Sequence, residues 1–406
     1  MNFLEKLLDG VAVEWKPLRK VVLPTSNIKW RNTDRIYRYI DLTSVSIETK
    51  KIAETTEITA NNAPSRAQKL VEKNDVIFAT TRPSQQRYCL IDNEYSGEVA
   101  STGYCVLRAK KDEVLPKWIL YCIASNDFKI YVEENQSGSA YPAISDTKVK
   151  DFIIPIPPLE IQAEIVPILD TFTALTDELT AELTDRKKQY NYYRDWLLTF
   201  EKGEVEWKPL GEIGEFIRGK RFTKADYVDD GIQVIHYGEI YTRYGVSTSH
   251  ALSQVRAEMA ASLRYAEPGD VVITDVGETV EDVGKAVAWI GNEKVAIHDH
   301  CYAFRHPMNP KFVSYCMQAT SFIAEKAKYV ARTKVNTLLI NGFSKISIPV
   351  PPLEEQARIV AILDKFDTLT NSISEGLPRE IALRQKQYEY YRDLLLTFPQ
   401  SEEVEA

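Results

Sequence analysis

The chain has 406 residues, of which 44% are apolar and 27% are charged, as in soluble globular proteins large enough for two or three domains. No apolar run is long enough to span a bilayer, the first residues lack the cationic and then apolar order of a signal peptide, and the five cysteines show no close pairing, so we expect a cytoplasmic protein. The net charge of −8 comes mainly from two acidic stretches, 156–207 and 350–406, whereas 16–155 and 208–349 are neutral to mildly basic, which permits binding to nucleic acid without requiring it.

An opening phrase, Val-Glu-Trp-Lys-Pro-Leu, stands at residues 13–18 and again at residues 205–210. Weaker echoes follow it in the same order in both copies. They predict a turn with a buried strand at 74–78 and 269–273, and a short helix opened by proline at 116–122 and 310–316. The chain is therefore predicted to be an internal repeat, in which a mixed α/β domain of about 140 residues followed by a long helix occurs twice.

The first helical stretch carries apolar residues at alternating steps of four and three from Ile161 to Leu197, a heptad seam that needs a partner helix. Two Thr-x-Glu-Leu tetrads at 176–183 insert a stutter, which keeps the seam facing inward. The second stretch has Gly376 and Pro378 in its middle, so we expect a kink or break there. The two seams are predicted to pack on each other as an antiparallel pair. The alternative is two amphipathic helices that dock separately on their own domains.

Tyrosines cluster near the end of both helical stretches, at 190, 192 and 193 and at 388, 390 and 391. Base stacking is one interpretation of such clusters. Their place on an acidic heptad seam favours packing within the helix pair.

The two copies differ in the segments that follow their shared strands. Residues 79–87 of the first copy are unlike residues 274–279 of the second, and residues 137–141 are unlike residues 331–335. Similar backbone scaffolds with different polar loops suggest two recognition domains that bind two different targets.

Three phrases in the helical stretches carry a resemblance to a known family. They are Pro-Pro-Leu-Glu-x-Gln at 157–162 and 351–356, Gln-Tyr-x-Tyr-Tyr-Arg-Asp at 189–195 and 387–393, and Glu-Gly-Leu-Pro-Arg-Glu at 375–380. With these phrases, essentially the whole chain resembles the specificity subunit of type I restriction–modification systems. The tetrads look like the spacer repeats of one subgroup of that family, with Thr176, Leu179, Thr180 and Leu183 as their first and last residues.

The resemblance implies an α+β fold with two mixed α/β target-recognition domains and two long helices packed as an antiparallel coiled coil, related by an internal pseudo-twofold axis. The implied domains are 1–155 and 204–349 for target recognition, 156–203 for the central conserved region or spacer, and 350–406 for the C-terminal conserved region. It also implies double-stranded DNA, two methylation subunits and restriction subunits as partners. The chain itself would bind no cofactor, and the partners would use S-adenosylmethionine, ATP and Mg. Each recognition domain would read one half of a split target.

Side chains that pair with base edges are concentrated in the loop segments of the first domain. Amides and guanidinium groups suit adenine and guanine in the major groove, although a solvated polar loop would look the same. The predicted DNA contacts in this domain are Thr80, Thr81, Arg82, Gln85, Gln86, Arg87, Ser137, Ser139 and Tyr141.

In the second domain, the cations Arg218, Lys220 and Arg221 are predicted to contact phosphates. The glycine spacing at 214–220 fits a nucleotide-binding loop, but Arg221 stands where a Ser or Thr should bind magnesium, which argues against one. A further set of predicted DNA contacts is His298, His300, Arg332, Lys334 and Asn336. A metal site at the two histidines would need a third ligand that the sequence does not place, so no metal is predicted.

No adenine-methyltransferase, helicase or nuclease motif occurs in the chain, and no catalytic residue is predicted. Two other functions remain open at this point. One is a coiled-coil scaffold whose two domains bind proteins, and the other is a metal-dependent hydrolase that uses His298 and His300.

Overall fold

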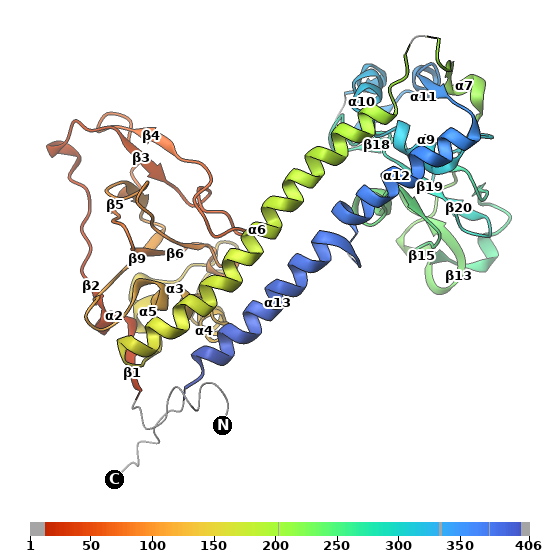
Figure 1. The fold of residues 1–406 in the computed structure, drawn as a ribbon. Helices are drawn as coiled ribbons and strands as arrows, with labels where there is room; N and C mark the ends of the chain where they lie inside the picture. The colour runs from red at the N-terminus through yellow and green to blue at the C-terminus, as the bar shows by residue number, and fades with distance from the viewer. Residues whose placement is uncertain (1–12, 202, 333–334, 373, 399–406) are drawn as a thin grey trace. The chain divides into compact units, whose positions relative to one another are not determined.

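The computed structural model describes residues 13–201, 203–332, 335–372 and 374–398. The chain forms two compact units. Unit 1 is Met1–Glu178 together with Ile381–Ala406, and unit 2 is Leu179–Glu380. The long helix α6 (Leu159–Leu197) therefore contributes its first half to unit 1 and its second half to unit 2 (Figure 1).

Within its described residues, unit 1 contains two four-stranded sheets and one two-stranded ribbon. The ribbon pairs β1 (Glu14–Pro17) with β10 (Ile153–Ile156). The first sheet has the order β2 (Val22–Leu23), β9 (Tyr104–Ala109), β6 (Val76–Ala79) and β7 (Tyr88–Leu90). The second has the order β4 (Thr56–Ile58), β3 (Tyr37–Ile40), β8 (Val99–Ser101) and β5 (Ala67–Leu70).

The central strand β6 of unit 1 is buried on both faces. Val76 and Phe78 face a core made with the helices, whereas Ile77 and Ala79 face a second core, as expected for alternating side chains of a strand. The smaller elements around these cores are α2 (Leu18–Val21), α3 (Pro116–Ala124), α4 (Asn126–Asn135), α5 (Asp146–Asp151), η1 (Trp30–Asn32) and η2 (Pro83–Gln85).

Unit 2 contains the corresponding ribbon, β11 (Glu206–Pro209) with β24 (Ser347–Val350). Its largest sheet has the order β12 (Glu215–Arg218), β21 (Cys301–Arg305), β17 (Val271–Thr274), β19 (Ala286–Trp289) and β14 (Ser247–Thr248). A second sheet has the order β15 (Ser253–Val255), β13 (Tyr227–Ile235), β20 (Val295–Ile297) and β16 (Tyr265–Ala266). A third has the order β18 (Val276–Gly277), β23 (Asn336–Leu338) and β22 (Val330–Ala331).

Strand β17 of unit 2 repeats the two-faced burial of β6, with Val271 and Ile273 in one core and Val272 in another. The smaller helices are α7 (Leu210–Ile213), α8 (Tyr237–Thr242), α9 (Pro310–Cys316), α10 (Thr320–Lys326) and α11 (Ile340–Phe343). The 3-10 turns are η3 (Lys224–Asp226), η4 (Ala257–Met259) and η5 (Ala327–Tyr329). The buried strands and the proline-opened helices predicted from the repeated phrases are thus confirmed.

The glutamine of each Pro-Pro-Leu-Glu-x-Gln phrase ties a long helix to the sheet domain beside it. Gln162 is fully buried, accepts the N–H of Leu115 at 2.9 Å and donates to the carbonyl of Pro157 at 2.8 Å. Gln356 does the same in unit 2 with Asn309 at 2.8 Å and Pro351 at 2.7 Å. These amides satisfy backbone groups at the start of α3 and α9, which explains why the phrase occurs twice.

The aspartate at the end of each tyrosine-rich phrase caps a helix in the unit built mainly from the other copy. Asp393 accepts the N–H of Asn126, the first residue of α4, at 3.3 Å. Asp195 accepts the N–H of Thr320, the first residue of α10, at 3.1 Å. Each unit therefore takes one helical phrase from its own copy and one from the other copy.

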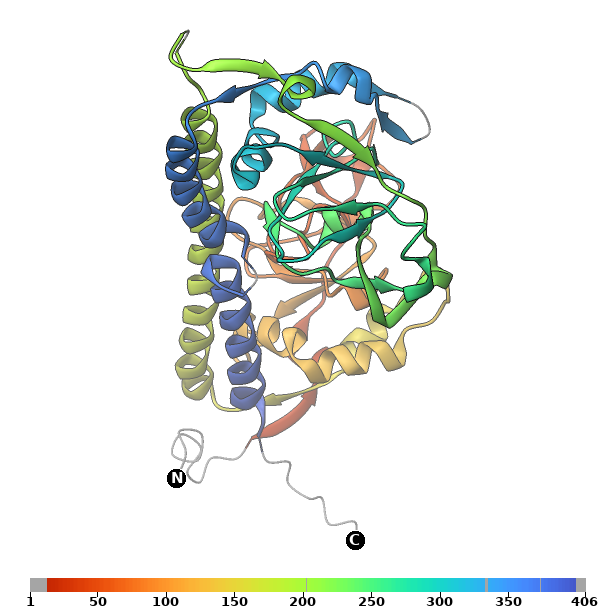
Figure 2. The same cartoon turned by 90° about the vertical axis from the view of Figure 1, so that its right-hand side faces the viewer.

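The long helices pair within each unit (Figure 2). In unit 1, Phe172 of α6 stacks on Tyr391 of α13 (Gly376–Leu396), with ring centroids 5.4 Å apart. In unit 2, Tyr193 of α6 stacks on Phe366 of α12 (Leu353–Asn371) at the same separation. The later residue of α6, Tyr193, contacts the earlier partner residue, Phe366, and the earlier residue Phe172 contacts the later partner Tyr391. The helices therefore run antiparallel, and the predicted antiparallel coiled coil is confirmed.

The predicted break in the second helical stretch is confirmed, because α12 ends at Asn371 and α13 begins at Gly376, whose φ of 72° favours glycine. The packing prediction for the tyrosines is wrong at two positions. Tyr192 and Tyr390 are 66% and 64% exposed, because they lie on the outer faces of their helices. Among the described residues, no helix is long and apolar enough to cross a membrane.

Candidate nucleic-acid interface

Unit 1 brings the two predicted DNA-contacting loops together at the end of β6. The N–H of Ile144 donates to the carbonyl of Thr80, and the N–H of Arg82 donates to the carbonyl of Pro142 at 2.7 Å. Thr81 and Ala143 form a β-bridge. Segments 80–87 and 136–144, separated by about fifty residues of chain, therefore form one surface, which we call surface 1.

The outer side chains of surface 1 are exposed polar and aromatic groups. The Arg82 guanidinium lies over the ring of Tyr141, 5.2 Å from its centroid, and Tyr141 is 70% exposed. Gln85, Ser137 and Ser139 are also exposed. An aromatic ring beneath a guanidinium limits its motion while leaving its N–H groups available to a ligand.

Several of the residues predicted for surface 1 serve its own structure. Thr80 is buried, and its hydroxyl donates to the carbonyl of Gly103 at 2.9 Å. Arg87 donates to the carbonyl of Val45 at 2.6 Å, and Gln86 donates to the carbonyl of Pro83 at 3.2 Å. These groups shape the loop, while the more exposed Arg82 and Gln85 are better placed for a ligand.

Lys50 belongs to the same area, although no sequence pattern pointed to it. Its Nζ donates to the carbonyl of Gln86 at 2.6 Å and lies 4.7 Å from the centre of the Tyr88 ring. Burial and, to a smaller extent, the charge of the neighbouring Arg87 lower the pKa of Lys50 to about 8. Lys50 reaches the loop from a distance of 36 residues, so only the fold could reveal it.

Unit 2 places His298 and His300 in the turn between β20 and β21, with ring centroids 5.5 Å apart. The N–H of His300 donates to Nδ1 of His298 at 3.2 Å, so the ring proton of His298 is on Nε2 and donates to the carbonyl of Phe222 at 3.2 Å. Burial lowers the pKa of His298 to about 4. His298 is therefore a neutral structural residue at pH 7.

Asp299 approaches Nδ1 of His298 to 3.0 Å, but this contact is not an ion pair. Nδ1 carries no proton in the tautomer that accepts from His300, and Oδ1 of Asp299 is buried with no hydrogen-bond partner. The neutral ring of His236 lies 4.6 Å from that of His298, and burial lowers the pKa of His236 as well.

Asp275 is the centre of a polar cluster that the sequence did not reveal. Its carboxylate is almost fully buried, with Oδ1 3.0 Å from Nδ1 of His300 and Oδ2 accepting from Nη2 of Arg218 at 3.2 Å. Nε of Arg218 donates to the carbonyl of Asp299 at 3.0 Å, and the guanidinium lies over Tyr302, 5.7 Å from its ring centre. We call the outer face of this cluster surface 2.

The other predicted residues of unit 2 lie around or near surface 2. Lys220 and Arg221 are exposed, and they follow directly on β12. Arg332 is exposed at the end of β22, and the Asn336 side chain donates to the carbonyl of Glu278 at 2.8 Å. Lys334 lies outside the described residues.

The nucleotide-loop interpretation of 214–220 is excluded by the backbone. Residues Glu215–Arg218 form strand β12 and pair with β21. A Cβ at Gly219 would come within 2.1 Å of the carbonyl oxygen of His298, so that glycine allows close backbone packing. No group of three or more His, Cys, Asp or Glu able to hold a metal occurs among the described residues.

Surfaces 1 and 2 stand on the same backbone frame. The N–H of Thr80 donates to the carbonyl of Gly103 at 2.8 Å, and the N–H of Asp275 donates to the carbonyl of His300 at 3.0 Å. The carbonyls of Thr80 and Asp275 accept from Ile144 and Leu338, respectively. Thr80 and Asp275 are thus equivalent positions, with a hydroxyl in one copy and a carboxylate in the other.

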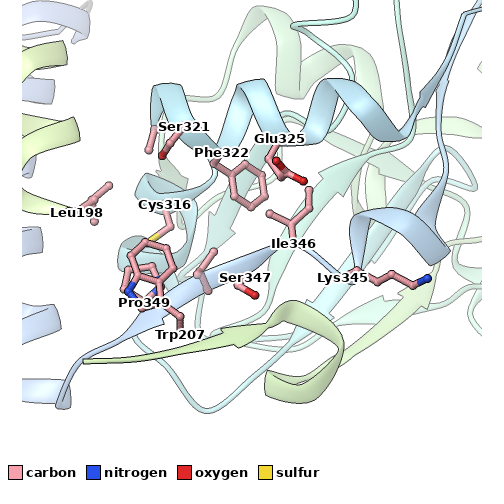
Figure 3. A pocket seen from close by; sticks show the side chains of 12 residues that line it. Leu198, Trp207, Cys316, Ser321, Phe322, Glu325, Lys345, Ile346, Ser347 and Pro349 are labelled. Atoms are coloured by element: carbon pink, nitrogen blue, oxygen red, sulfur yellow. The ribbon is translucent and has the colours of Figure 1, made fainter. Parts of the chain in front are cut away.

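A hollow of about 360 Å³ in unit 2 lies away from these candidates, among Trp207, Phe322, Glu325 and Ile346 (Figure 3). At the corresponding place in unit 1, the ring of Phe152 packs on Phe128 at 4.9 Å and on Tyr131 at 5.2 Å. Ile346 and Glu325 replace Phe152 and Tyr131, so smaller or polar side chains leave the space. No predicted DNA contact lines it.

With the geometry established, comparison with known proteins identifies the family. The sequence model of the family described as "Type I restriction modification DNA specificity domain" matches residues 22–186 and 202–383. The chain belongs to this family. The specificity subunit of the Escherichia coli type I restriction enzymes EcoR124I and EcoR124II is 35% identical, over 100% of this chain and 99% of the relative. A putative specificity subunit of Haemophilus influenzae, S.HindORF215P, is 30% identical over 98% of both chains.

Two solved structures share the fold. A chain from a structure describing complex assembly and conformational transition of the type I system has a TM-score of 0.64 at 24% identity and covers 95% of this chain and 97% of its own length. The specificity subunit of a Mycoplasma genitalium type I system has a TM-score of 0.52 at 14% identity, with coverages of 97% and 98%. The predicted fold class is confirmed.

The protein is thus a DNA specificity subunit of a type I restriction–modification system. This result favours the DNA-reading interpretation over the scaffold and hydrolase alternatives. The assignment to the Thr-x-Glu-Leu subgroup, the domain boundaries and the individual DNA contacts stay predictions.

Proposed function

We propose that unit 1 and unit 2 each read one half of a split double-stranded DNA target, with a stretch of unspecified sequence between the halves. One observation carries this proposal: surfaces 1 and 2 occupy equivalent places on the same backbone frame but present different polar groups. Equivalent placement suits two similar grooves, and different side chains suit two different base sequences.

The methylation that the specificity subunit directs is proposed to fall on adenine, with S-adenosylmethionine bound by the methylation subunits and ATP and Mg used with the restriction subunits. Two methylation subunits are proposed for each specificity subunit. Exposed apolar pairs support this number, because each unit has one: Tyr192 with Trp196 on α6, and Tyr390 with Leu394 on α13. Exposed aromatic residues of this kind are typical of protein interfaces. The complex is proposed to act in the cytoplasm.

The spacer role of Thr176, Leu179, Thr180 and Leu183 also belongs to the proposal. All four lie in the uninterrupted helix α6, where one tetrad adds about 6 Å of length, nearly two base-pair rises. Leu179 and Leu183 are half-buried along the helix seam.

Long-read mapping of methylated adenines in cells that carry this chain and its methylation subunits tests the proposal. We expect a split motif. Deleting residues 180–183 is expected to change the length of the gap and to leave both half-sequences unchanged. Unsplit or absent methylation in cells that make the intact complex would contradict the proposed function.

A further inference from the structure

Surface 2 contains an arginine whose orientation is determined by the protein from three sides. Nε of Arg218 donates to the backbone carbonyl of Asp299, Nη2 donates to the Asp275 carboxylate, and the ring of Tyr302 lies against the guanidinium. The Arg218 side chain is nevertheless 53% exposed, while the Asp275 side chain is 5% exposed. A buried acid thus holds an accessible guanidinium in one orientation.

Comparison of the two copies distinguishes this ion pair from the ion pairs that only maintain the fold. Arg305 forms a two-pronged contact with Asp270, and Arg108 forms the same contact with Asp75 in unit 1. An arrangement present in both copies serves the shared fold. The pair of Arg218 with Asp275 has no such twin, because Thr80 occupies the place of Asp275.

The hydrogen bonds leave one edge of Arg218 for a ligand. A guanidinium has five N–H groups, and the protein uses the hydrogen on Nε and one on Nη2. Three hydrogens remain, two on Nη1 and one on Nη2, and one hydrogen from each of these nitrogens forms a pair of parallel donors. In the major groove, guanine presents two adjacent acceptors, O6 and N7. Adenine would bring its N6 amino donor against a guanidinium donor.

We propose that Arg218 recognises a guanine in the half-site read by unit 2, and that Asp275 is the positioning residue that aims it. The inference rests on the proposed function, because it assumes that unit 2 reads DNA. His300 completes the arrangement. Its Nδ1 lies on the other oxygen of Asp275, so both carboxylate oxygens are engaged by protein groups and the acid does not face a phosphate unpaired.

The first test leaves the protein unchanged. The complex of this chain with its methylation subunits is bound to duplexes that carry the mapped target, in which each guanine of both half-sites is replaced in turn by 7-deazaguanine. This base lacks the N7 acceptor. We expect one guanine whose replacement weakens binding about 10-fold, as for the loss of a specific arginine contact.

Variants then assign that guanine to Arg218. Arg218→Lys keeps the charge but loses the two parallel donors, so we expect weaker binding to the natural target and no further loss with 7-deazaguanine at that position. Asp275→Asn is expected to reduce the same sensitivity several-fold while binding to the other half-site is unchanged. Arg243→Lys, at an exposed arginine of the same unit that is not among the predicted contacts, is the matched control and is expected to retain the full sensitivity.

The two proposals fail in different ways. A split motif in which no guanine shows an Arg218-dependent response to 7-deazaguanine overturns the guanine assignment and leaves the proposed function intact. An unsplit motif overturns the proposed function itself. If Asp275→Asn leaves the 7-deazaguanine response at full strength while Arg218→Lys abolishes it, the positioning role of Asp275 is wrong.

Discussion

Units 1 and 2 share their scaffold hydrogen bonds and differ in what those bonds support. In unit 1 the residue directly after the central strand β6 is Thr80, whose hydroxyl donates to the backbone carbonyl of Gly103. The exposed Arg82 nearby lies over the ring of Tyr141. In unit 2 the same position is Asp275, which organises Arg218 and His300. The comparison teaches that duplication acts as an internal control: contacts found in both copies maintain the fold, and contacts found in one copy are candidates for reading DNA.

The largest expected effect comes from breaking a shared contact. Gln162→Leu and Gln356→Leu each leave a backbone N–H at the start of a short helix without its buried acceptor. We expect each change to lower the free energy of unfolding by about 2 to 4 kcal/mol. Urea denaturation measures the loss, and the mapped methylation motif of any complex that still assembles is expected to be unchanged. A changed half-sequence would show that the shared contacts also carry specificity.

An intermediate effect is expected from acid, and only in unit 2. All five histidines of the sequence lie at positions 236–306, within unit 2. Burial lowers the pKa of His298 and of His306 to about 4 in the folded state, so between pH 6.5 and 4 the unfolded chain binds more protons than the folded chain. The free energy of unfolding therefore has its full value, as far as these two histidines are concerned, above pH 6.5, and it decreases as the pH falls toward 4.

Hydrogen exchange at pH 7 and pH 5, corrected for intrinsic exchange rates, measures this difference. We expect the opening free energy of the cores of unit 2 to fall by about 1 to 3 kcal/mol, because one pKa unit corresponds to about 1.4 kcal/mol. Unit 1 is the control within the same sample. An equal loss of protection in both units would rule out the histidines as the cause.

The smallest effect is expected at Arg82. Its guanidinium rests on an exposed ring, so it is held less firmly than Arg218. Arg82→Ala is expected to weaken binding of the complex to its target about 5-fold, and to relax one position in the half-site read by unit 1. Lys148→Ala, at an exposed site on α5, is the control. Competition binding with single-base variants measures the effect, and relaxation in the other half-site would reverse the assignment of the two units.

Much of the fold followed from the sequence because its signals are local or repeated. The heptad seam predicted the helix pairing, and Gly376 with Pro378 predicted the break between α12 and α13. The surfaces were harder to predict because they are built from distant segments. Arg218 and Asp275 are 57 residues apart in the chain, and an isolated acid in the sequence gives no sign that a guanidinium and an imidazole meet it. The polarity of Thr80 predicts a DNA contact, but this residue is buried at the end of β6, where its hydroxyl donates to the carbonyl of Gly103.

The crossed capping by Asp195 and Asp393 has a consequence for synthesis on the ribosome. Most of unit 1 is made first, yet Asp393, which caps α4, lies in α13 of the second copy and follows all of unit 2 in the chain. Unit 1 therefore gains its part of α13 only after all of unit 2 has been translated. A product terminated before α13 would lack that helix. The folding of unit 1 is therefore complete only in chains that also contain unit 2.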